Sequence, residues 1–215
     1  MDMREPNGAE GDPLERLLSE VGRCRVCAAD LPLGPRPVLR GSGRARLMII
    51  SQAPGTRAHA SGLSFDDRSG DVLRDWLAID RATFYDQSRV AIMPMGFCYP
   101  GRDAAGGDRP PRRECAALWH APVRALLPDI RLTLLVGSYA VREYLGAQAK
   151  PTMQATVRAW MDYGPEFLPL PHPSWRTTFW IKRNPWFLAE TLPDLRARMH
   201  RLLTGDPGER QGNCR

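Results

Sequence analysis

The sequence predicts an α/β fold in which helices cover both faces of a central, mostly parallel sheet of four strands. Four short apolar runs, typical of buried strands, alternate along the chain with longer amphipathic segments that are typical of helices. Continuous apolar strands of this kind occur in parallel sheets that are covered on both sides. The expected strands are residues 46–51, 89–95, 131–137 and 167–171.

The segments between these runs predict the helices. Asp12 can cap a first helix that has Pro13 at its first position, and the leucines and the valine that follow form one apolar face. Further helices are expected at residues 71–77, 114–127, 138–146, 152–161 and 185–203. We expect residues 1–12 to be a flexible leader, residues 13–204 to form one domain, and residues 205–215, with Cys214, to be a disordered tail.

The composition favours a soluble protein with a polyanionic partner. The chain has 30 lysines and arginines against 24 aspartates and glutamates, a net charge of +6 and a pI near 9.4. A basic balance suits nucleic acid, because each phosphate contact releases counterions. No apolar run approaches the length of a membrane span, and the first residues are polar, unlike a signal peptide. We therefore expect a cytoplasmic protein without a membrane partner, associated with the nucleoid if the source is prokaryotic.

Polar and turn-forming residues follow the expected strands, where ligands of open parallel sheets bind. The first strand runs into SQAPG, residues 51–55, in which Pro54 and Gly55 turn the chain and bring backbone N–H groups towards a ligand. The amide of Gln52 can both donate to and accept from the edge of a base. Phe65, flanked by polar residues, is placed to stack on a planar ligand. The alternative is an ordinary turn, with Phe65 filling the core.

The fourth strand runs into a histidine between two prolines. The stretch PLPHPSWRTTFW, residues 169–180, is predicted to be a stiff, exposed loop, because prolines fix their own φ and extend the preceding residue. His172 thereby gains a defined orientation for hydrogen bonding. Trp175 and Arg176 follow at a position from which a loop can enter a nucleic-acid groove or fill a vacated stack. The alternative is a proline-stabilised surface turn.

Four cysteines predict a metal centre. Cys24 and Cys27 form a C-x-x-C pair, and Cys98 and Cys115 lie far downstream. Four thiolates satisfy an iron–sulfur cluster or a zinc ion, and their spacing does not decide between the two. Buried free thiols are the structural alternative.

Taken together, these motifs resemble those of the uracil-DNA glycosylase superfamily, and most closely its iron–sulfur branch, often called family four. That branch carries an N-terminal C-x-x-C, a GEAPG turn, a G-x-P-F-x-x-R-A-G segment, a C-R-P-P loop, a later cysteine and an H-P loop. The counterparts stand here in the same order, over residues 14–200. They are Cys24 and Cys27, SQAPG, then Gly62, Phe65, Arg68 and Gly70, then Cys98-Tyr99-Pro100, Cys115, and His172-Pro173-Ser174.

The resemblance implies a three-layer αβα sandwich, a structural 4Fe–4S cluster on the four cysteines, and hydrolysis of the bond between uracil and deoxyribose. The protein is then expected to act as a monomer on DNA that contains uracil or another deaminated base. Gln52, Ala53 and Gly55 line the base pocket, and Phe65 stacks on the flipped base. His172 hydrogen-bonds the uracil oxygen that gains charge, while Ser174 and Arg176 lie on the loop that enters the duplex.

Three positions depart from the family pattern. Gln52 stands where the turn usually has an acid, and an amide cannot act as a general base. Asp66 or Asp67 is therefore the expected base or electrostatic partner of the sugar cation, and Asp66 is taken first. Pro94 or Met95 replaces the asparagine that usually reads uracil, and the H-P loop reads HPSWRT in place of H-P-S-P-R-N.

These departures keep three alternatives open beside a repair glycosylase. One is a non-catalytic iron–sulfur protein that binds nucleic acid. Another is a glycosylase-like protein that is cross-linked to the abasic sugar through His172. The third is a zinc-stabilised α/β protein with another small-molecule substrate.

Overall fold

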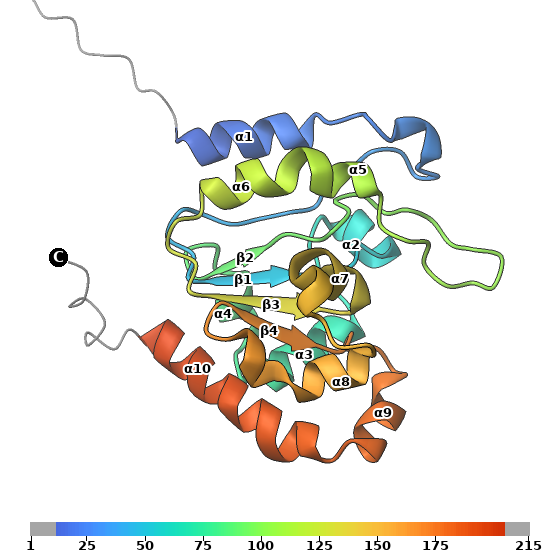
Figure 1. The fold of residues 1–215 in the computed structure, drawn as a ribbon. Coiled ribbons are helices and arrows are strands. Elements are labelled where there is room, and N and C mark those ends of the chain that lie inside the picture. The colour runs from blue at the N-terminus through green and yellow to red at the C-terminus, as the bar shows by residue number, and fades with distance from the viewer. Residues whose placement is uncertain (1–11, 205–215) are drawn as a thin grey trace, which may run out of the picture.

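An all-parallel sheet of four strands forms the centre of the fold (Figure 1). The computed structural model describes residues 12–204. The strands are β1 (Leu47–Ile50), β2 (Val90–Ile92), β3 (Leu132–Val136) and β4 (Phe167–Leu170), in the spatial order β2-β1-β3-β4. Each lies inside one of the four apolar runs, so the predicted strands and the predicted α/β class are confirmed. The predicted leader before Asp12 and the predicted tail with Cys214 lie outside the described residues.

The helices fill the segments between the strands and follow the last one. They are α1 (Pro13–Gly22), α2 (Thr56–Ser61), α3 (Arg68–Leu77), α4 (Arg81–Tyr85), α5 (Arg113–Cys115), α6 (Ala121–Ala125), α7 (Ser138–Leu145), α8 (Met153–Arg158), α9 (Thr177–Arg183) and α10 (Leu192–Thr204). Five short 3-10 or π segments adjoin them: η1 (Ala28–Asp30), η2 (Ala116–His120), η3 (Gly146–Gln148), η4 (Trp160–Tyr163) and η5 (Phe187–Thr191). No helix among the described residues is long and apolar enough to span a membrane.

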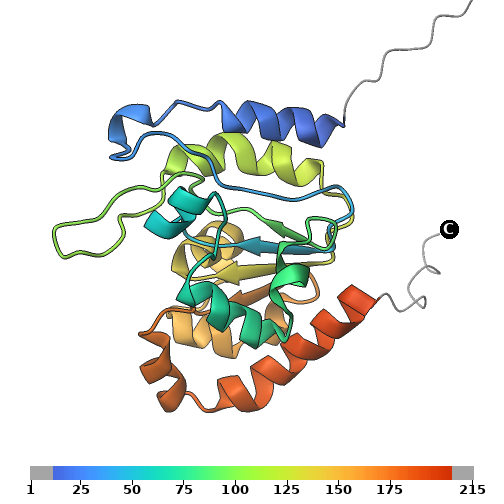
Figure 2. The same cartoon turned by 180° about the vertical axis from the view of Figure 1, so that it is seen from behind.

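Helices cover both faces of the sheet, which makes three layers (Figure 2). Side chains alternate along each strand, so Leu47 and Ile49 face one way while Met48 and Ile50 face the other. The first pair packs in a core with α3, α8 and α10, and the second pair in a core with α1, α6 and α7. The sandwich implied by the family resemblance is therefore present.

Local sequence signals account for the helix ends that were predicted well. Asp12 accepts a hydrogen bond from the Leu14 N–H at 2.9 Å, and Pro13 occupies the first turn, so α1 begins where the cap and the proline place it. Phe187 is fully buried against α10. Its burial fixes the start of the C-terminal helical stretch.

One segment was predicted wrongly. The exposed loop expected over residues 169–180 ends early, because Thr177–Arg183 forms α9. The β-branched and aromatic residues of TTFWI have low helix propensity, so a helix was not predicted there. The N–H and hydroxyl groups that follow His172 fold back onto its carbonyl and begin the turn that α9 continues. The short helices α2 and α4 were also not predicted.

Candidate active site

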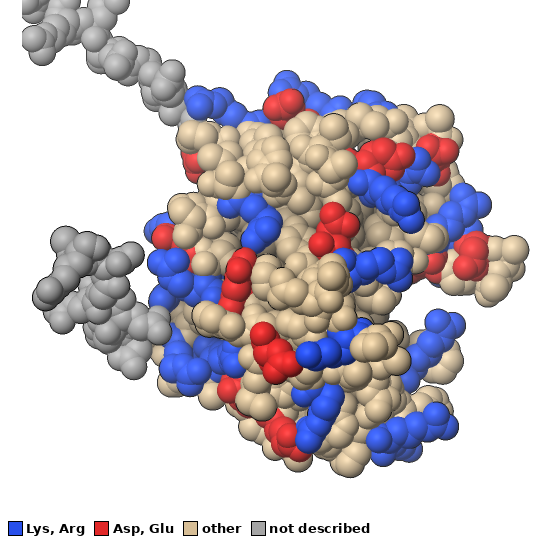
Figure 3. All heavy atoms as spheres, viewed as in Figure 1, with Lys and Arg blue, Asp and Glu red and all other residues tan. Residues whose placement is uncertain are grey.

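The predicted site residues gather where the parallel strands end. Gln52 follows β1, and His172 follows β4, with β3 between the two strands. Neighbouring strands lie roughly 4.8 Å apart, so two spacings set the Gln52 and His172 backbones about 10 Å apart across the end of β3. Figure 3 shows a notch at this edge of the molecule, between the loop that follows β2 and the region of α9. The sheet order thus brings the two loops to one edge, as ligand sites of open parallel sheets require.

His172 is held against the end of β3 and is half-buried. Gly137 has φ +89°, and a Cβ there would lie 3.5 Å from the His172 Cβ. The Ser174 N–H donates to the His172 carbonyl at 2.8 Å, and the Thr177 hydroxyl donates to the same oxygen. These contacts fix the backbone that carries the imidazole.

The His172 imidazole is poised to be neutral. Burial lowers its pKa below the ordinary value of 6.5, and the carboxylates of Asp67 and Asp108 oppose that shift without cancelling it. A neutral imidazole has one N–H to donate and one nitrogen to accept. It can therefore offer a hydrogen bond without adding a full positive charge to the pocket.

The turn after β1 is anchored on one side and open on the other. The Gln52 side-chain amide donates a long hydrogen bond of 3.5 Å to the Arg109 carbonyl, and the Gly96 N–H donates to the Gln52 carbonyl at 3.0 Å. Ala53 is half-buried, and a Cβ added to Gly55 would meet no atom within 4 Å. The loop after β2 thus supports the turn, while the space next to Gly55 is open.

Phe65 is constrained from three directions. Its ring meets the Phe84 ring edge-on at 6.0 Å, and its carbonyl accepts a hydrogen bond of 3.3 Å from the buried Arg74 guanidinium. A Cβ on Gly70 would lie 1.8 Å from the Phe65 carbonyl oxygen, so only glycine fits there. Phe65 itself has φ +61°, a conformation that bulky residues adopt only when their surroundings hold them in it. The ring belongs to the core and is 8% exposed.

The two aspartates after Phe65 have different environments. Asp66 forms an ion pair of 2.8 Å with Arg81, which holds the pKa of its carboxyl below the usual range. Asp67 accepts the Gly70 N–H at 3.0 Å as the cap of α3, and its charge acts on His172. Asp67, like Asp108, thus acts on the imidazole through its charge, whereas the predicted Asp66 is committed to Arg81.

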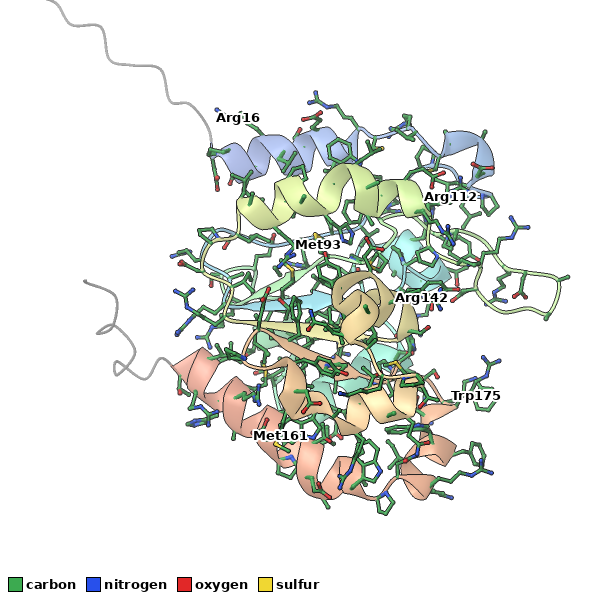
Figure 4. The ribbon with its side chains drawn as sticks, viewed as in Figure 1. Arg16, Met93, Arg112, Arg142, Met161 and Trp175 are labelled. Carbon is green, nitrogen blue, oxygen red and sulfur yellow. The ribbon has the colours of Figure 1, made fainter. Side chains whose placement is uncertain are left out.

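The loop after His172 presents a bare aromatic ring to solvent. Trp175 is 68% exposed and projects from the edge of the molecule in Figure 4. The Arg176 guanidinium lies over its ring at 5.2 Å, and Ser174 is half-buried beneath the two. Phe179, on α9, is 62% exposed. A cation and unpaired aromatic rings suit contacts with phosphates and bases.

The four predicted cysteine ligands line one small cavity. All are free thiols, with Cys24 half-buried and the other three buried. Burial, and to a smaller extent the neighbouring cysteines, raise the pKa of Cys98 and raise that of Cys115 to about 11. Among residues 12–204, no three His, Cys, Asp or Glu side chains converge closely enough to bind a single metal ion. The four thiols line a cavity and do not converge on the position of one metal ion.

Hydrogen-bond donors surround the same cavity. The Phe97 N–H donates to the Cys115 Sγ at 3.5 Å, and the Arg112 guanidinium opposes the rise that burial causes in the pKa of Cys27. The Trp119 indole N–H and the Arg112 Nε are buried without a partner among the described residues, and both side chains line the cavity. Buried donors are seldom left unsatisfied. Four thiols and two unpaired donors fit a group that is rich in acceptors, such as a sulfide-bearing cluster.

Several residues of the site escaped sequence reasoning. Arg74, Gly137 and Asp108 act by touching backbone or by charge at a distance, and nothing in their local sequence marks them. Trp119 and Arg112 stand near a cysteine in the sequence, but their unpaired donors show only in three dimensions. Gly70 was part of the motif, yet the close approach that requires it was not evident.

The comparison with known families agrees with this geometry. A family model, the uracil DNA glycosylase superfamily, matches residues 40–196. The match spans the sheet, the turn at Gln52, Phe65 and the loop of His172. This chain therefore belongs to the uracil DNA glycosylase superfamily.

Proposed function

We propose that this protein is a DNA repair glycosylase that hydrolyses the N-glycosidic bond of uracil, or of another deaminated base, after flipping the nucleotide out of the helix. The observation that carries this proposal is the common edge of the sheet shared by the Gln52 turn, which follows β1, and His172, which follows β4. The family supplies a glycosylase-like function and DNA as partner. The base and the residue roles below are the proposal.

Extrusion of the nucleotide is the first requirement. It costs a few kcal/mol and least for a mispaired base such as uracil opposite guanine. We assign the stacking contact to the 8% of Phe65 that is exposed, and a full stack of a base on an aromatic ring recovers at most about 1–3 kcal/mol. Because Gly70 and Arg74 hold the Phe65 backbone, the ring is in place before the base arrives.

His172 then stabilises the leaving base. Cleavage of the bond leaves negative charge on the base and cation-like character on the sugar. The His172 N–H, together with backbone N–H groups of the 53–55 turn, donates to the oxygen that gains the charge. Preorganised donors at such a position supply the largest single share of catalysis in many enzymes.

Water attack completes the reaction. One water adds its oxygen to the sugar carbon, and its proton ends on the departed base. Gln52 orients the water or the base, since its amide can donate and accept but cannot take up a proton. Asp67 supplies the negative charge that favours the sugar cation. It takes the part first assigned to Asp66, whose carboxylate is committed to Arg81.

Two basic surfaces flank the pocket and suit the DNA backbone. On one side lie Ser174, Trp175 and Arg176, with Trp175 placed to fill the vacated stack. On the other side a groove of about 670 Å³ is lined by Arg109, Arg112 and Arg113, with Asp30 and Glu114 in ion pairs with Arg112. Guanidinium groups bind phosphates in a two-point fashion, so both surfaces suit a strand that crosses the site.

We also propose that Cys24, Cys27, Cys98 and Cys115 hold a 4Fe–4S cluster, with zinc as the alternative. A zinc ion needs four sulfurs within about 2.3 Å of one point, whereas these thiols line a cavity with unpaired donors on its wall. The cluster would tie residues 24–27 to the loop after β2 and thus fix the carbonyl that anchors Gln52. Metal analysis and the visible absorbance of purified protein distinguish the two.

Incubation with uracil-, hypoxanthine- and xanthine-containing oligonucleotides tests the function. We expect the wild type to produce alkali-labile strands, and His172→Ala and Phe65→Ala to fold but lose base release by at least 10²-fold. His200→Ala, an exposed histidine of α10, is the matched control. A denaturant-stable adduct would indicate cross-linking through His172, and retention without cleavage would indicate mere binding. Either result would refute hydrolysis.

A further inference from the structure

A second cavity lies at the opposite edge of the sheet, where the strands begin. Its volume is about 590 Å³. Arg46 and Arg131 immediately precede β1 and β3, and Arg198 and Arg201 project from α10. We call this cavity the amino-edge pocket. In Figure 3 arginine and lysine atoms gather on this side of the molecule, over the amino ends of the strands.

The charge of the amino-edge pocket is strongly positive. Four arginines line it against a single carboxylate, that of Asp194. Asp194 accepts from the Arg198 Nε at 2.6 Å, and so one cation is compensated. Arg131 and Arg201 are exposed and make no ion pair with another residue of 12–204. Separated guanidinium groups at the mouth of a cavity attract a ligand with several carboxylates or phosphates.

Part of this cationic wall is preorganised. The Arg46 guanidinium donates to the Leu202 carbonyl at 3.2 Å. The Arg198 guanidinium lies over the Trp160 ring at 5.5 Å, and an added Cβ on Gly164 would meet it at 3.3 Å. Side chains held in this way lose little entropy when a ligand binds.

The rest of the pocket wall is apolar, and this favours a peptide over a phosphate as its ligand. Leu132, Pro165 and Leu202 line the pocket, and Met161 at its rim is 67% exposed. Exposed methionine adapts its shape to apolar side chains. Phosphate groups make no favourable contact with apolar side chains, whereas an acidic peptide with an apolar side chain contacts both the arginines and the apolar part of the pocket.

The pocket is also out of reach of DNA bound at the catalytic edge. The strands have three to five residues and rise about 3.3 Å per residue, so the sheet places about 10–16 Å of packed core between the two edges. The catalytic residues follow the strands, whereas Arg46 and Arg131 precede them. A duplex bound at the first edge leaves the second free.

We propose that the amino-edge pocket is a docking site for an acidic protein segment that carries an apolar side chain. Its carboxylates pair with Arg131 and Arg201 at the rim, and its apolar side chain rests on Met161 and Leu202. The enzyme thereby binds a partner protein and damaged DNA at the same time. The site does not depend on the reaction proposed above.

Fluorescence anisotropy with a labelled peptide of four aspartates and one leucine tests this proposal in the full-length protein. We expect the double variant Arg131→Glu, Arg201→Glu to raise the Kd at least tenfold. The matched control is Arg16→Glu, Arg142→Glu, which makes the same charge change on α1 and α7 and keeps the wild-type Kd. Met161→Ser should weaken the binding of the peptide that contains leucine, but not the binding of a peptide that has serine in place of the leucine. Base release from a short oligonucleotide should be unchanged in every variant.

Two results would overturn the proposal. One is a peptide affinity that is undetectable, or that falls equally in the control variant, since the pocket would then offer no specific site. The other is stronger binding of a thymidine oligonucleotide that the same rim variants abolish, which would make the pocket a nucleic-acid site.

Discussion

Gly70 offers the most direct way to move the Phe65 ring without touching it. Gly70→Ala places a Cβ 1.8 Å from the Phe65 carbonyl oxygen, whereas such contacts are not found below 3.0 Å. The two backbones must therefore separate by at least 1.2 Å, the difference between the two distances. The shift falls on a residue with positive φ, whose carbonyl is also fixed by Arg74.

A displacement of this size has a calculable effect. Misplacement by 1 Å costs about 10²-fold in rate where catalysis depends on alignment, and overpacking costs about 1–3 kcal/mol of stability. We expect Gly70→Ala to lower single-turnover base release about 10²-fold while most of the protein still folds. Single-turnover cleavage of a uracil-containing duplex measures the rate, and urea unfolding measures the stability.

Gly22→Ala is the matched control, since a Cβ there meets no atom within 4 Å. It should leave both quantities unchanged or raise stability slightly. Wild-type base release by a folded Gly70→Ala protein would show that the position of Phe65 does not matter. The base pocket would then have to lie elsewhere.

Three further changes probe the cavity, the core and the sugar cation. Trp119→Phe removes the unpaired indole N–H, which is proposed to donate to the cluster. The absorbance of the proposed iron–sulfur cluster should remain, while spectroelectrochemistry should give a more negative midpoint potential. An unchanged potential would contradict a hydrogen bond from Trp119 to the cluster. His120 is buried and forms a hydrogen bond with Tyr144, and burial lowers its pKa from 6.5 to about 4. Between these two pH values the unfolded state binds a proton that the folded state does not. Stability should be full above pH 6.5 and fall by about 3 kcal/mol towards pH 4 in urea unfolding, and this loss should be absent from His120→Gln. Asp67→Asn should slow base release roughly tenfold or more, whereas Asp66→Asn should not; equal rates would remove Asp67 from the site.

The strands were predictable because a strand that is buried on both faces has a continuous apolar sequence. LMII is apolar throughout and LTLLV is apolar except for the buried Thr133, and a parallel sheet covered on both sides gives both faces of a strand to the core. Their order was not predictable, since β1 pairs with β3 across a long intervening segment. That pairing is what brings Gln52 and His172 to one edge.

The prediction of helices failed where tertiary contacts override helix propensity. α9 forms from threonines and aromatic residues because the turn after His172 starts it, not because its sequence favours a helix. The predicted exposed loop extends wrongly beyond Arg176, where α9 begins, and its prolines Pro169, Pro171 and Pro173 are buried. Helical backbone now carries Phe179 at the surface.

The site was predictable in its residue types and not in its partners. His172 and Gln52 lie in turns after strands, and the four cysteines have a spacing typical of a metal centre, so the sequence alone predicted a role for them. Asp66 and Asp67 are neighbours of the same type, and the sequence does not tell which pairs with Arg81 and which caps α3 and acts on His172 through its charge. Arg74, buried beneath Phe65, had no sequence signal at all.

A crystal structure with a duplex that carries 2′-fluoro-2′-deoxyuridine, whose glycosidic bond resists cleavage, examines the central claim most directly. We expect the uracil outside the helix, with its ring on Phe65, one carbonyl oxygen within 3.2 Å of a His172 nitrogen and the turn of Gln52 on its far side. A uracil that stays paired in the duplex, or that lies at another edge of the sheet, would contradict the account.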